Sequence, residues 1–285
     1  MSRIVPILSA VCVAGIGLTA WSRLAANGTE IDIPTRARQP NEPATAPEQA
    51  LAAARRSCEM PPLDAIVTRL GAAAEAQPDK AESWHLLAEA LLLRAQQRTH
   101  LRGIAVGRPV FAELPTAQQS DLERGLRAVA TARELGDDSG DLDRIEAGLM
   151  SQRITGWASA LQWNGRIAQA LERAAGKTPD DPDLHVALGL RKLLAPRLLG
   201  HDPEKALEHF TFAARARADD ERPAVFAGMA CYLQRKRQLA ITWLETAVAR
   251  NPNNTFAKVV LSRLRRGEEA PFARDVTDEE AAAVR

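Results

Sequence analysis

Apolar residues recur at helical spacing through most of this chain, in blocks that Gly, Pro, Asp or Asn residues interrupt. A period near 3.6 residues places the apolar side chains of each block on one face of an α-helix. The composition agrees, because 53 of the 285 residues are alanine, the strongest helix former. The aromatic and β-branched residues that strands prefer are scarce. The pattern predicts an all-α fold and excludes a β-sandwich or β-barrel.

The helical blocks come in pairs that share one register. In the last pair, small residues stand at Gly228, Ala240 and Ala247, a bulky residue at Leu244, and Pro252 follows the second helix. Small residues let antiparallel helices approach closely, and proline ends a helix. The same register marks five second helices, and a single helix near residues 255–265 follows them. The closing positions of the second helices are Pro78, Asp137, Pro179, Ala218 and Pro252.

This register resembles that of the tetratricopeptide repeat (TPR) family over most of the chain. Ala206, Phe210 and Ala213, for example, match the A-x3-F-x2-A signature of a TPR second helix. The resemblance implies an all-α, TPR-like α-solenoid of about five helix pairs plus a C-terminal capping helix. Residues 47–268 would form the solenoid, and residues 269–285 a C-terminal tail with a short helix.

The spacing between equivalent positions indicates where residues have been inserted. Only the last repeat keeps the 34-residue period of the family. The largest insertion, around residues 98–115, contains Gly103 and Gly107, which favour a turn or an irregular crossing. Such an insertion often carries added function, although a plain surface excursion has the same signature. Its role stays open at this point.

The N-terminal region differs from the repeats. Residues 4–21 carry no charge and, as a helix of about 27 Å, match the hydrocarbon core of a bilayer. We predict a transmembrane anchor in residues 1–23, with a cleaved signal peptide as the alternative, and a proline-rich linker in residues 24–46. The expected location is the inner membrane, single-pass, with the repeats in the periplasm. Cleavage would instead leave a soluble periplasmic protein.

The polar residues give no sign of catalysis. The formal net charge of +1 does not favour a nucleic-acid partner. The sequence contains no nucleophile elbow, P-loop, dinucleotide-binding or zinc-protease motif. No two of the five histidines are four residues apart, and Cys12, Cys58 and Cys231 form no C-x-x-C pair. We therefore predict a non-enzymatic protein with no catalytic residues, no metal site and no cofactor.

The TPR resemblance implies that a partner binds along the concave face, which the first helices line. Repeats that clamp a terminal carboxylate carry lysine and asparagine at family positions five and nine, where this chain has His85 and Glu89 in one repeat and Val225 and Met229 in another. The lining is instead mostly apolar with a basic end, which suits an amphipathic helix or an extended apolar segment. In the alternative, the insertion or the helix beginning near residues 277–280 covers these positions. The predicted groove residues are Glu82, His85, Glu89, Val186, Leu190, Arg222, Val225, Met229, Tyr232, Phe256 and Arg263.

Two weaker resemblances bear on function. The stretch 196–206 is similar to a P-x-x-L-G-G-D-x-x-K-A loop of periplasmic TPR proteins that accompany TRAP transporters, with His201 in place of the second glycine. The W-x-x-L-A element that begins at Trp84 is similar to repeats of TPR factors for cytochrome c maturation. We expect a membrane-tethered periplasmic scaffold that binds a protein or peptide, as an assembly or maturation factor does. The alternative is an accessory component of a solute transporter that handles a small ligand; the oligomeric state is left open.

Overall fold

The computed structural model describes residues 46–104 and 114–284, and all regular structure in these residues is helical. The predicted anchor and nearly all of the predicted linker lie outside the described residues. Among those described, no helix combines the length and the apolar character that a membrane crossing requires. The all-α prediction is confirmed. The helices are α1 (Ala46–Ser57), α2 (Met60–Ala76), α3 (Ala81–Gln97), α4 (Thr116–Glu134), α5 (Gly140–Ser151), α6 (Trp157–Lys177), α7 (Pro182–Leu194), the 3-10 turn η1 (Arg197–Leu199), α8 (Pro203–Ala216), α9 (Arg222–Leu233), α10 (Arg237–Arg250), α11 (Thr255–Arg266) and α12 (Asp278–Val284).

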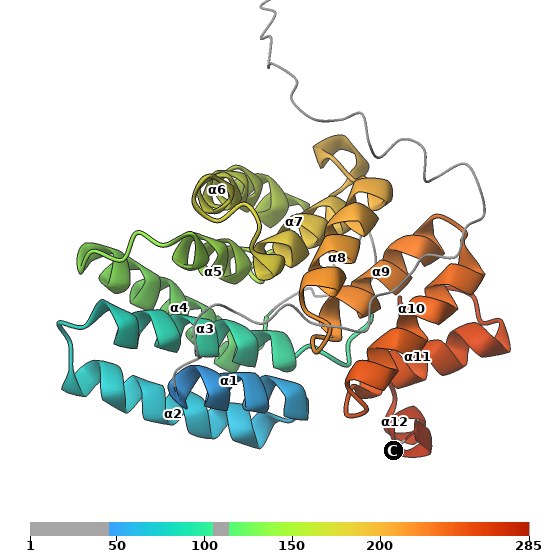
Figure 1. Cartoon of the computed structure of the whole chain (residues 1–285), viewed down its shortest axis with the longest axis horizontal. Helices are drawn as coiled ribbons and strands as arrows, with labels where there is room; N and C mark the ends of the chain where they lie inside the picture. Colours follow the sequence, from blue (N-terminus) through green and yellow to red (C-terminus); the bar gives the residue numbers. More distant parts are fainter. Residues whose placement is uncertain (1–45, 105–113, 285) are drawn as a thin grey trace, which may run out of the picture. The chain divides into compact units, whose positions relative to one another are not determined.

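The helices pair in chain order, as Figure 1 shows. α1 packs with α2, α3 with α4, α5 with α6, α7 with α8 and α9 with α10, and α11 packs on α10. The five second helices of the sequence register are α2, α4, α6, α8 and α10, and the single helix after them is α11. This arrangement is the predicted TPR-like α-solenoid.

Glycines of the register lie where the two helices of a pair touch. A Cβ on Gly189 of α7 would lie 2.5 Å from a ring carbon of Phe210 in α8. A Cβ on Gly228 of α9 would lie 3.1 Å from Cγ of Leu244 in α10. Phe210 and Leu244 have no exposed surface. Neither the Phe210 ring nor the Leu244 side chain therefore has free space into which to move. The small residues of the register therefore set the distance between paired helices.

Local sequence also sets the helix boundaries. The Asp181 side chain accepts hydrogen bonds from the first turn of α7, and the Asp202 side chain accepts one from Lys205 N in α8. A proline follows each of these caps, at a position where no backbone N–H is needed. The inserted residues between α7 and α8 form η1, which ends at Gly200 with a φ of 97°. The short insertion is thus a capped turn that leads directly into α8.

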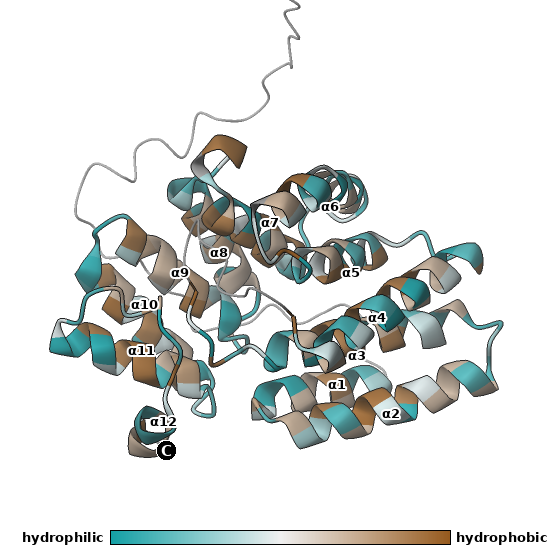
Figure 2. Ribbon diagram, turned by 180° about the vertical axis from the view of Figure 1, so that it is seen from behind, coloured by the Kyte–Doolittle hydropathy of each residue, from teal (hydrophilic) through white to brown (hydrophobic). Residues whose placement is uncertain are grey.

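Hydrophobic and hydrophilic residues alternate along most helices, as Figure 2 shows. α9 departs from this pattern because it is buried on nearly all sides, with Val225, Met229 and Cys231 among its buried residues. It contacts α7, α8 and α10. A helix that is apolar all round is stable only when neighbours enclose it.

Residues far apart in the sequence meet beside the largest insertion. Ile104 N donates to the Phe272 carbonyl oxygen at 2.7 Å, and Val276 N donates to the Leu101 carbonyl oxygen at 2.8 Å. Between them, Gly103 N donates to the Asp275 carboxylate at 2.7 Å. The first residues of the insertion therefore hold the chain that follows α11; residues 105–113 lie outside the described part.

Gly103 is required by this contact. A Cβ at this position would lie 2.5 Å from the Ala273 carbonyl carbon and 2.6 Å from that of Arg274. Both atoms are backbone, which cannot rotate away as a flexible side chain can. Only glycine lets the two segments approach this closely.

Candidate functional site

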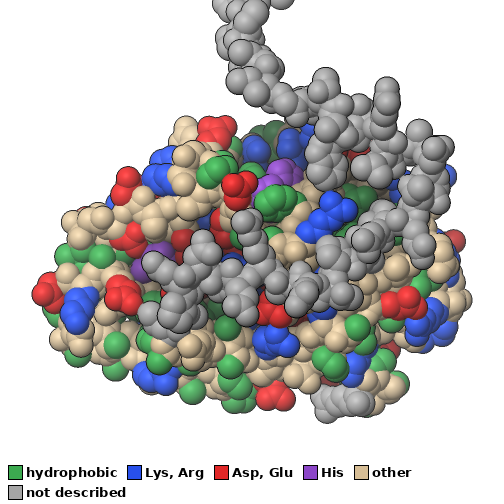
Figure 3. All heavy atoms as spheres, viewed as in Figure 1, with side chains coloured by type: hydrophobic (Ala, Val, Ile, Leu, Met, Phe, Trp, Pro, Cys, Tyr) green, Lys and Arg blue, Asp and Glu red, His purple; other side chains and the backbone are tan. Residues whose placement is uncertain are grey.

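The first helices α3, α5, α7 and α9 contact one another in turn. Together with α11, they form a surface that we call the inner face. Figure 3 shows acidic, basic and histidine side chains gathered in a hollow at the middle of the view. The inner face has a charged half, formed by α3, α5, α7 and the start of α9, and a C-terminal half formed by the rest of α9 and by α11.

In the charged half, His85 of α3 contacts two aspartates, Asp137 between α4 and α5 and Asp141 in α5. Its Nδ1 lies 2.7 Å from an oxygen of Asp137, and its Nε2 lies 2.9 Å from an oxygen of Asp141. Burial alone would lower the pKa of His85, but the hydrogen bonds to Asp141 and Asp137 raise it to about 9. The imidazole is therefore protonated at neutral pH, when both ring nitrogens donate.

Arg144 of α5 extends this network to the neighbouring helices. Its guanidinium lies 2.5 Å from Asp141, and it is 3.9 Å from both Glu89 of α3 and Asp181 before α7. Burial would lower the pKa of Arg144, but the surrounding carboxylates, Asp141 foremost, hold it above its usual range. Burial raises the pKa of Glu89, the carboxylate of this set that lies on α3. A single arginine thus connects three successive repeats.

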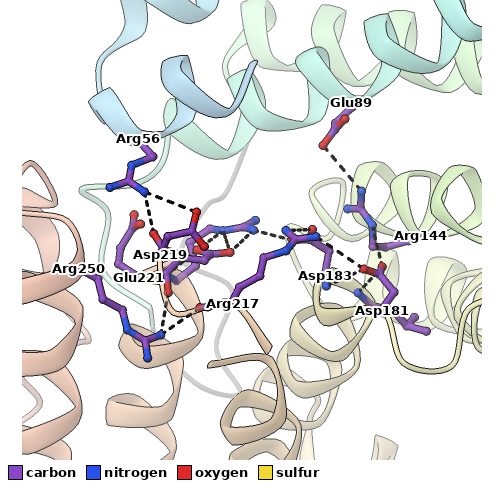
Figure 4. A network of polar contacts seen from close by, with 12 residues as sticks. Arg56, Glu89, Arg144, Asp181, Asp183, Arg217, Asp219, Glu221 and Arg250 are labelled. Atoms are coloured by element: carbon purple, nitrogen blue, oxygen red, sulfur yellow. Dashed lines mark hydrogen bonds and ion pairs between the residues drawn. The ribbon is translucent and has the colours of Figure 1, made fainter. Parts of the chain in front are cut away.

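Asp183 of α7 is the next centre of the network, which Figure 4 shows from close by. It pairs with Arg217 and, at 2.6 Å, with Arg222 of α9, which is also 2.6 Å from Asp220. Burial would raise the pKa of Asp183, but the guanidinium groups, Arg222 first, hold it well below its usual range. The carboxylate is therefore ionised at neutral pH.

Arg55, near the end of α1, lies beside this cluster but has fewer polar contacts than the other cations. Within the described part of the chain, Asp220 and Asp183 act on its guanidinium through charge, without a hydrogen bond. Repulsion from Arg222 and burial lower its pKa, although Asp220 and Asp183 partly offset both effects. Among the cations of the network, Arg55 is the one whose hydrogen-bonding capacity is least used.

The C-terminal half is filled by the protein's own chain. Arg263 has no exposed surface, and its Nη2 lies 2.5 Å from the Glu280 carboxylate. The hydroxyl of Tyr232 accepts a hydrogen bond from Ala270 N at 3.0 Å, and the Tyr232 ring packs against Phe272. A partner could not reach Arg263 without moving these residues.

The structure places the eleven predicted groove residues in three environments. Glu82 is exposed, and five others are partly exposed: His85, Glu89, Leu190, Arg222 and Tyr232. The remaining five, Val186, Val225, Met229, Phe256 and Arg263, are buried. The accessible part of the inner face is therefore charged, which differs from the mostly apolar lining expected from the sequence. The apolar side chains at the buried positions pack between first helices and are not available to a partner.

Several residues of the network were not foreseen from the sequence. Asp141 and Arg144 belong to α5, the first helix of the third repeat, and Arg217 and Asp220 lie in the connection between α8 and α9. A usable signal was present, because Asp residues cluster before three successive first helices, at 137–143, 180–183 and 219–220. Their convergence on one surface depends on how the repeats stack.

Metal and thiol chemistry find little support in the described residues. They contain no group of three or more His, Cys, Asp or Glu side chains that could hold a metal ion. His209 faces His185, with 3.1 Å between the Nδ1 atoms, while His201 bonds to the Leu193 carbonyl oxygen. Burial raises the pKa of Cys58 to about 11 and that of Cys231 to about 12, so both thiols are protonated at neutral pH.

A cavity lies between the second helices α4 and α6. It has a volume of about 600 Å³ and is lined by residues of α4, α6 and the chain before each of them, among them Leu122, Arg153, Ser159 and Trp163. Arg153 and Arg166 each lie about 5 Å from the centre of the Trp163 ring system. Its volume is within the range that small-molecule sites occupy.

No protein-family model matches this chain, and no curated protein matches it in sequence. Solved TPR structures share its fold. TTC0263, a thermophilic TPR protein of Thermus thermophilus, superposes with a TM-score of 0.55 at 14% identity, over 78% of this chain and 100% of its own. A monomeric mutant of IFIT1 with m7Gppp-AAAA superposes with a TM-score of 0.53 at 16% identity, over 84% of this chain and 49% of that chain. This chain thus spans about half the length of the IFIT1 structure, and both likenesses are likenesses of fold.

Proposed function

We propose that this protein is a non-enzymatic scaffold that binds a protein or peptide partner on the charged half of the inner face. The proposal rests chiefly on the polar network, which draws side chains from α3, α5, α7 and α9 onto one surface and leaves several of them partly exposed. Arg217, for example, keeps 36% of its side chain exposed, and Asp141 keeps 41%. A segment lying on this surface would meet hydrogen-bonding groups from successive repeats at once.

The charges of the network also bear on partner chemistry. Most arginines are already paired with carboxylates, so a partner must exchange hydrogen bonds rather than supply a missing counter-charge. Such exchange favours specificity over high affinity, because each displaced ion pair offsets part of the gain. A partner segment with both donors and acceptors, such as a polypeptide in extended conformation, meets this requirement.

Site-specific photocrosslinking in the full-length chain tests the proposal. A photoreactive residue at Leu190 or Glu82, both on the inner face, should give covalent adducts with one discrete partner. The matched control is Leu161, which is 65% exposed but lies on the second helix α6. Equal adducts from Leu161 and Leu190 would contradict binding on the inner face.

We further propose that residues 1–23 anchor the protein in the inner membrane, with the helical region in the periplasm. The support is the uncharged run 4–21 and the proline-rich stretch after it. Carbonate extraction together with sequencing of the mature N-terminus tests the anchor: Met1 should be retained on a membrane-embedded protein. A mature chain that begins near residue 26 would instead indicate a cleaved signal peptide. Protection of the helical region from protease in intact spheroplasts would contradict the periplasmic location.

A role as an assembly or maturation factor follows if the partner is bound only before it matures. Pulse-labelled cells would then show adducts at Leu190 that disappear during the chase. Adducts that persist unchanged would indicate a permanent complex.

The 600 Å³ cavity favours a second candidate function, the handling of a small ligand as an accessory of a solute transporter. Trp163 lines this cavity and reports on its occupancy through its fluorescence. A saturable change in fluorescence with one organic solute, lost in Trp163→Phe but kept in Trp243→Phe, would support this function. Trp243 is a suitable control because it is fully buried in α10.

A further inference from the structure

The chain that follows α11 lies on the C-terminal half of the inner face. We call residues 268–284 the C-terminal segment. It begins beyond the Gly267 helix cap, runs past Tyr232 and Arg263 in bends and turns, and ends in the short helix α12. Its contacts are those that a bound peptide would make.

Arg263 holds the segment mainly through backbone groups. Its Nη1 donates to the Pro271 and Arg274 carbonyl oxygens, each at 3.0 Å, and its Nη2 donates to the Asp275 carbonyl oxygen at 2.8 Å. The remaining donors reach the two oxygens of Glu280, at 2.9 and 2.5 Å. One guanidinium therefore binds three peptide carbonyls and one carboxylate, which requires a chain that turns around it and carries an acidic residue.

An aromatic residue provides the apolar part of the contact. Phe272 is 2% exposed, and its ring centre lies 5.7 Å from that of Tyr232. The Tyr232 hydroxyl accepts from Ala270 N, and Ile104 N donates to the Phe272 carbonyl oxygen. The backbone on both sides of the aromatic side chain is thus bound to the inner face and to the start of the insertion.

Apolar burial contributes less to holding the segment than to holding the helices beneath it. Only Pro271, Phe272 and Ala281 are buried, whereas most of its other residues are exposed. Burial of one phenylalanine side chain contributes about 1.5–3 kcal/mol. Much less apolar surface is buried here than by α9 or α11. Segments with few buried contacts open at a lower free energy than the whole domain.

We infer that the C-terminal half of the inner face is a binding site for an acidic, turn-forming segment with an aromatic residue. The C-terminal segment occupies this site in cis, and a partner segment of the same chemistry binds by displacing it. This inference rests on the proposed function, because it extends partner binding from the charged half to the rest of the inner face. It also explains why two predicted groove residues, Tyr232 and Arg263, contact a peptide that belongs to the chain itself.

A labelled peptide with the sequence of residues 268–285 tests the inference on the full-length protein. The double substitution Phe272→Ala and Glu280→Gln weakens the segment in cis, so the native peptide should bind this variant at least tenfold more tightly than it binds the unmodified chain. The control substitution Glu279→Gln changes an exposed acid of α12 and should leave peptide affinity unchanged. A peptide that itself lacks Phe272 and Glu280 should not bind. Equal peptide affinity for the double variant and the unmodified chain overturns the inference.

Hydrogen exchange on the unmodified protein gives a second test that does not depend on a folded variant. Amides of residues 272–276 should exchange at least tenfold faster than those of α11, and excess peptide should accelerate them further. Exchange of both regions at one common rate, with no response to peptide, overturns the inference. Crosslinking from Leu190 is unaffected by that result, so failure of this inference and failure of the proposed function are distinguishable.

Discussion

The two halves of the inner face use arginine in different ways. Arg263 in the C-terminal half is completely buried, and its acceptors all come from the next 17 residues of the chain. Arg222 in the charged half keeps 21% of its side chain exposed, and it pairs with Asp220 beside it and with Asp183 in the preceding repeat. One arginine holds a local segment in place, and the other joins separate repeats.

This difference follows from the cost of burying charge. A guanidinium without solvent must have every donor paired, and only a flexible segment that wraps around it can supply so many acceptors. Arginines that connect rigid helices receive fewer acceptors and keep contact with water. A partner therefore finds partly exposed side chains in the charged half, whereas in the C-terminal half it must first displace the protein's own chain.

The largest effect is expected from Arg263→Ala. The substitution leaves Glu280 and three carbonyl oxygens without their donor, and breaking a buried pair in this way costs about 3–5 kcal/mol. Urea denaturation should show this loss of unfolding free energy. Arg265→Ala is the matched control, because Arg265 is 58% exposed and, among the described residues, pairs only with Glu245, so its loss should be about 1 kcal/mol or less. Similar losses of unfolding free energy for both variants would mean that the buried contacts of Arg263 do not stabilise the fold.

In the charged half, the contribution of His85 should depend on pH. Because the folded-state pKa of about 9 is above the ordinary value of 6.5, the stabilisation is complete below pH 6.5 and is lost as the pH rises through 9. The shift corresponds to about 3 kcal/mol. The unfolding free energies of the unmodified chain and of His85→Gln should differ most at pH 6 and converge near pH 10. A difference that stays constant over this range would show that His85 is not protonated in the folded state.

Gly103→Ala should affect only the C-terminal half. Its Cβ would overlap the Ala273 backbone and push the C-terminal segment away, at a cost of about 1–3 kcal/mol. Hydrogen exchange should speed up in residues 272–276 and stay unchanged in α3 to α7. Gly165→Ala is the control, because nothing lies within 4 Å of that position in α6 and alanine favours a helix. Unchanged exchange in Gly103→Ala would contradict the close contact.

The smallest effect on stability is expected from Arg55→Gln. Because Arg55 is repelled by Arg222 and has no hydrogen bond within the described residues, its loss should change the unfolding free energy by less than about 0.5 kcal/mol. If the charged half binds the partner, adducts from a photoreactive residue at Leu190 should nevertheless fall several-fold. Arg56→Gln is a suitable comparison, since Arg56 is on the same helix and has its own contact with Asp219. Adducts that respond equally to both substitutions would show that neither cation acts at the partner site.

The helix pairs were predictable because the residues that define them act on immediate neighbours. Gly189 and Phe210 contact each other in one helix pair, and Gly228 and Leu244 do so in the next. Their spacing in the sequence repeats because each repeat solves the same packing problem. The TPR resemblance correctly placed all five second helices and the single helix after them.

The candidate site was predicted less well because it depends on contacts between repeats. Val225 and Phe256 occupy groove positions of the family frame, yet helix–helix packing buries them. Arg144 was missed because its importance arises from carboxylates on three separate helices. No local pattern reports which side chains will share one surface after the repeats stack.

By itself, the sequence determined the helices, their pairing and the order of the repeats, since short-range periodicity and the size of residues at helix contacts are sufficient for that. The tertiary structure decided which part of the inner face is open. Residues 101–104 and 272–276 are separated by most of the chain, and their hydrogen bonds bring the C-terminal segment onto Tyr232 and Arg263. Contacts of this kind depend on the summed rotation of all the repeats between them, which no single repeat encodes.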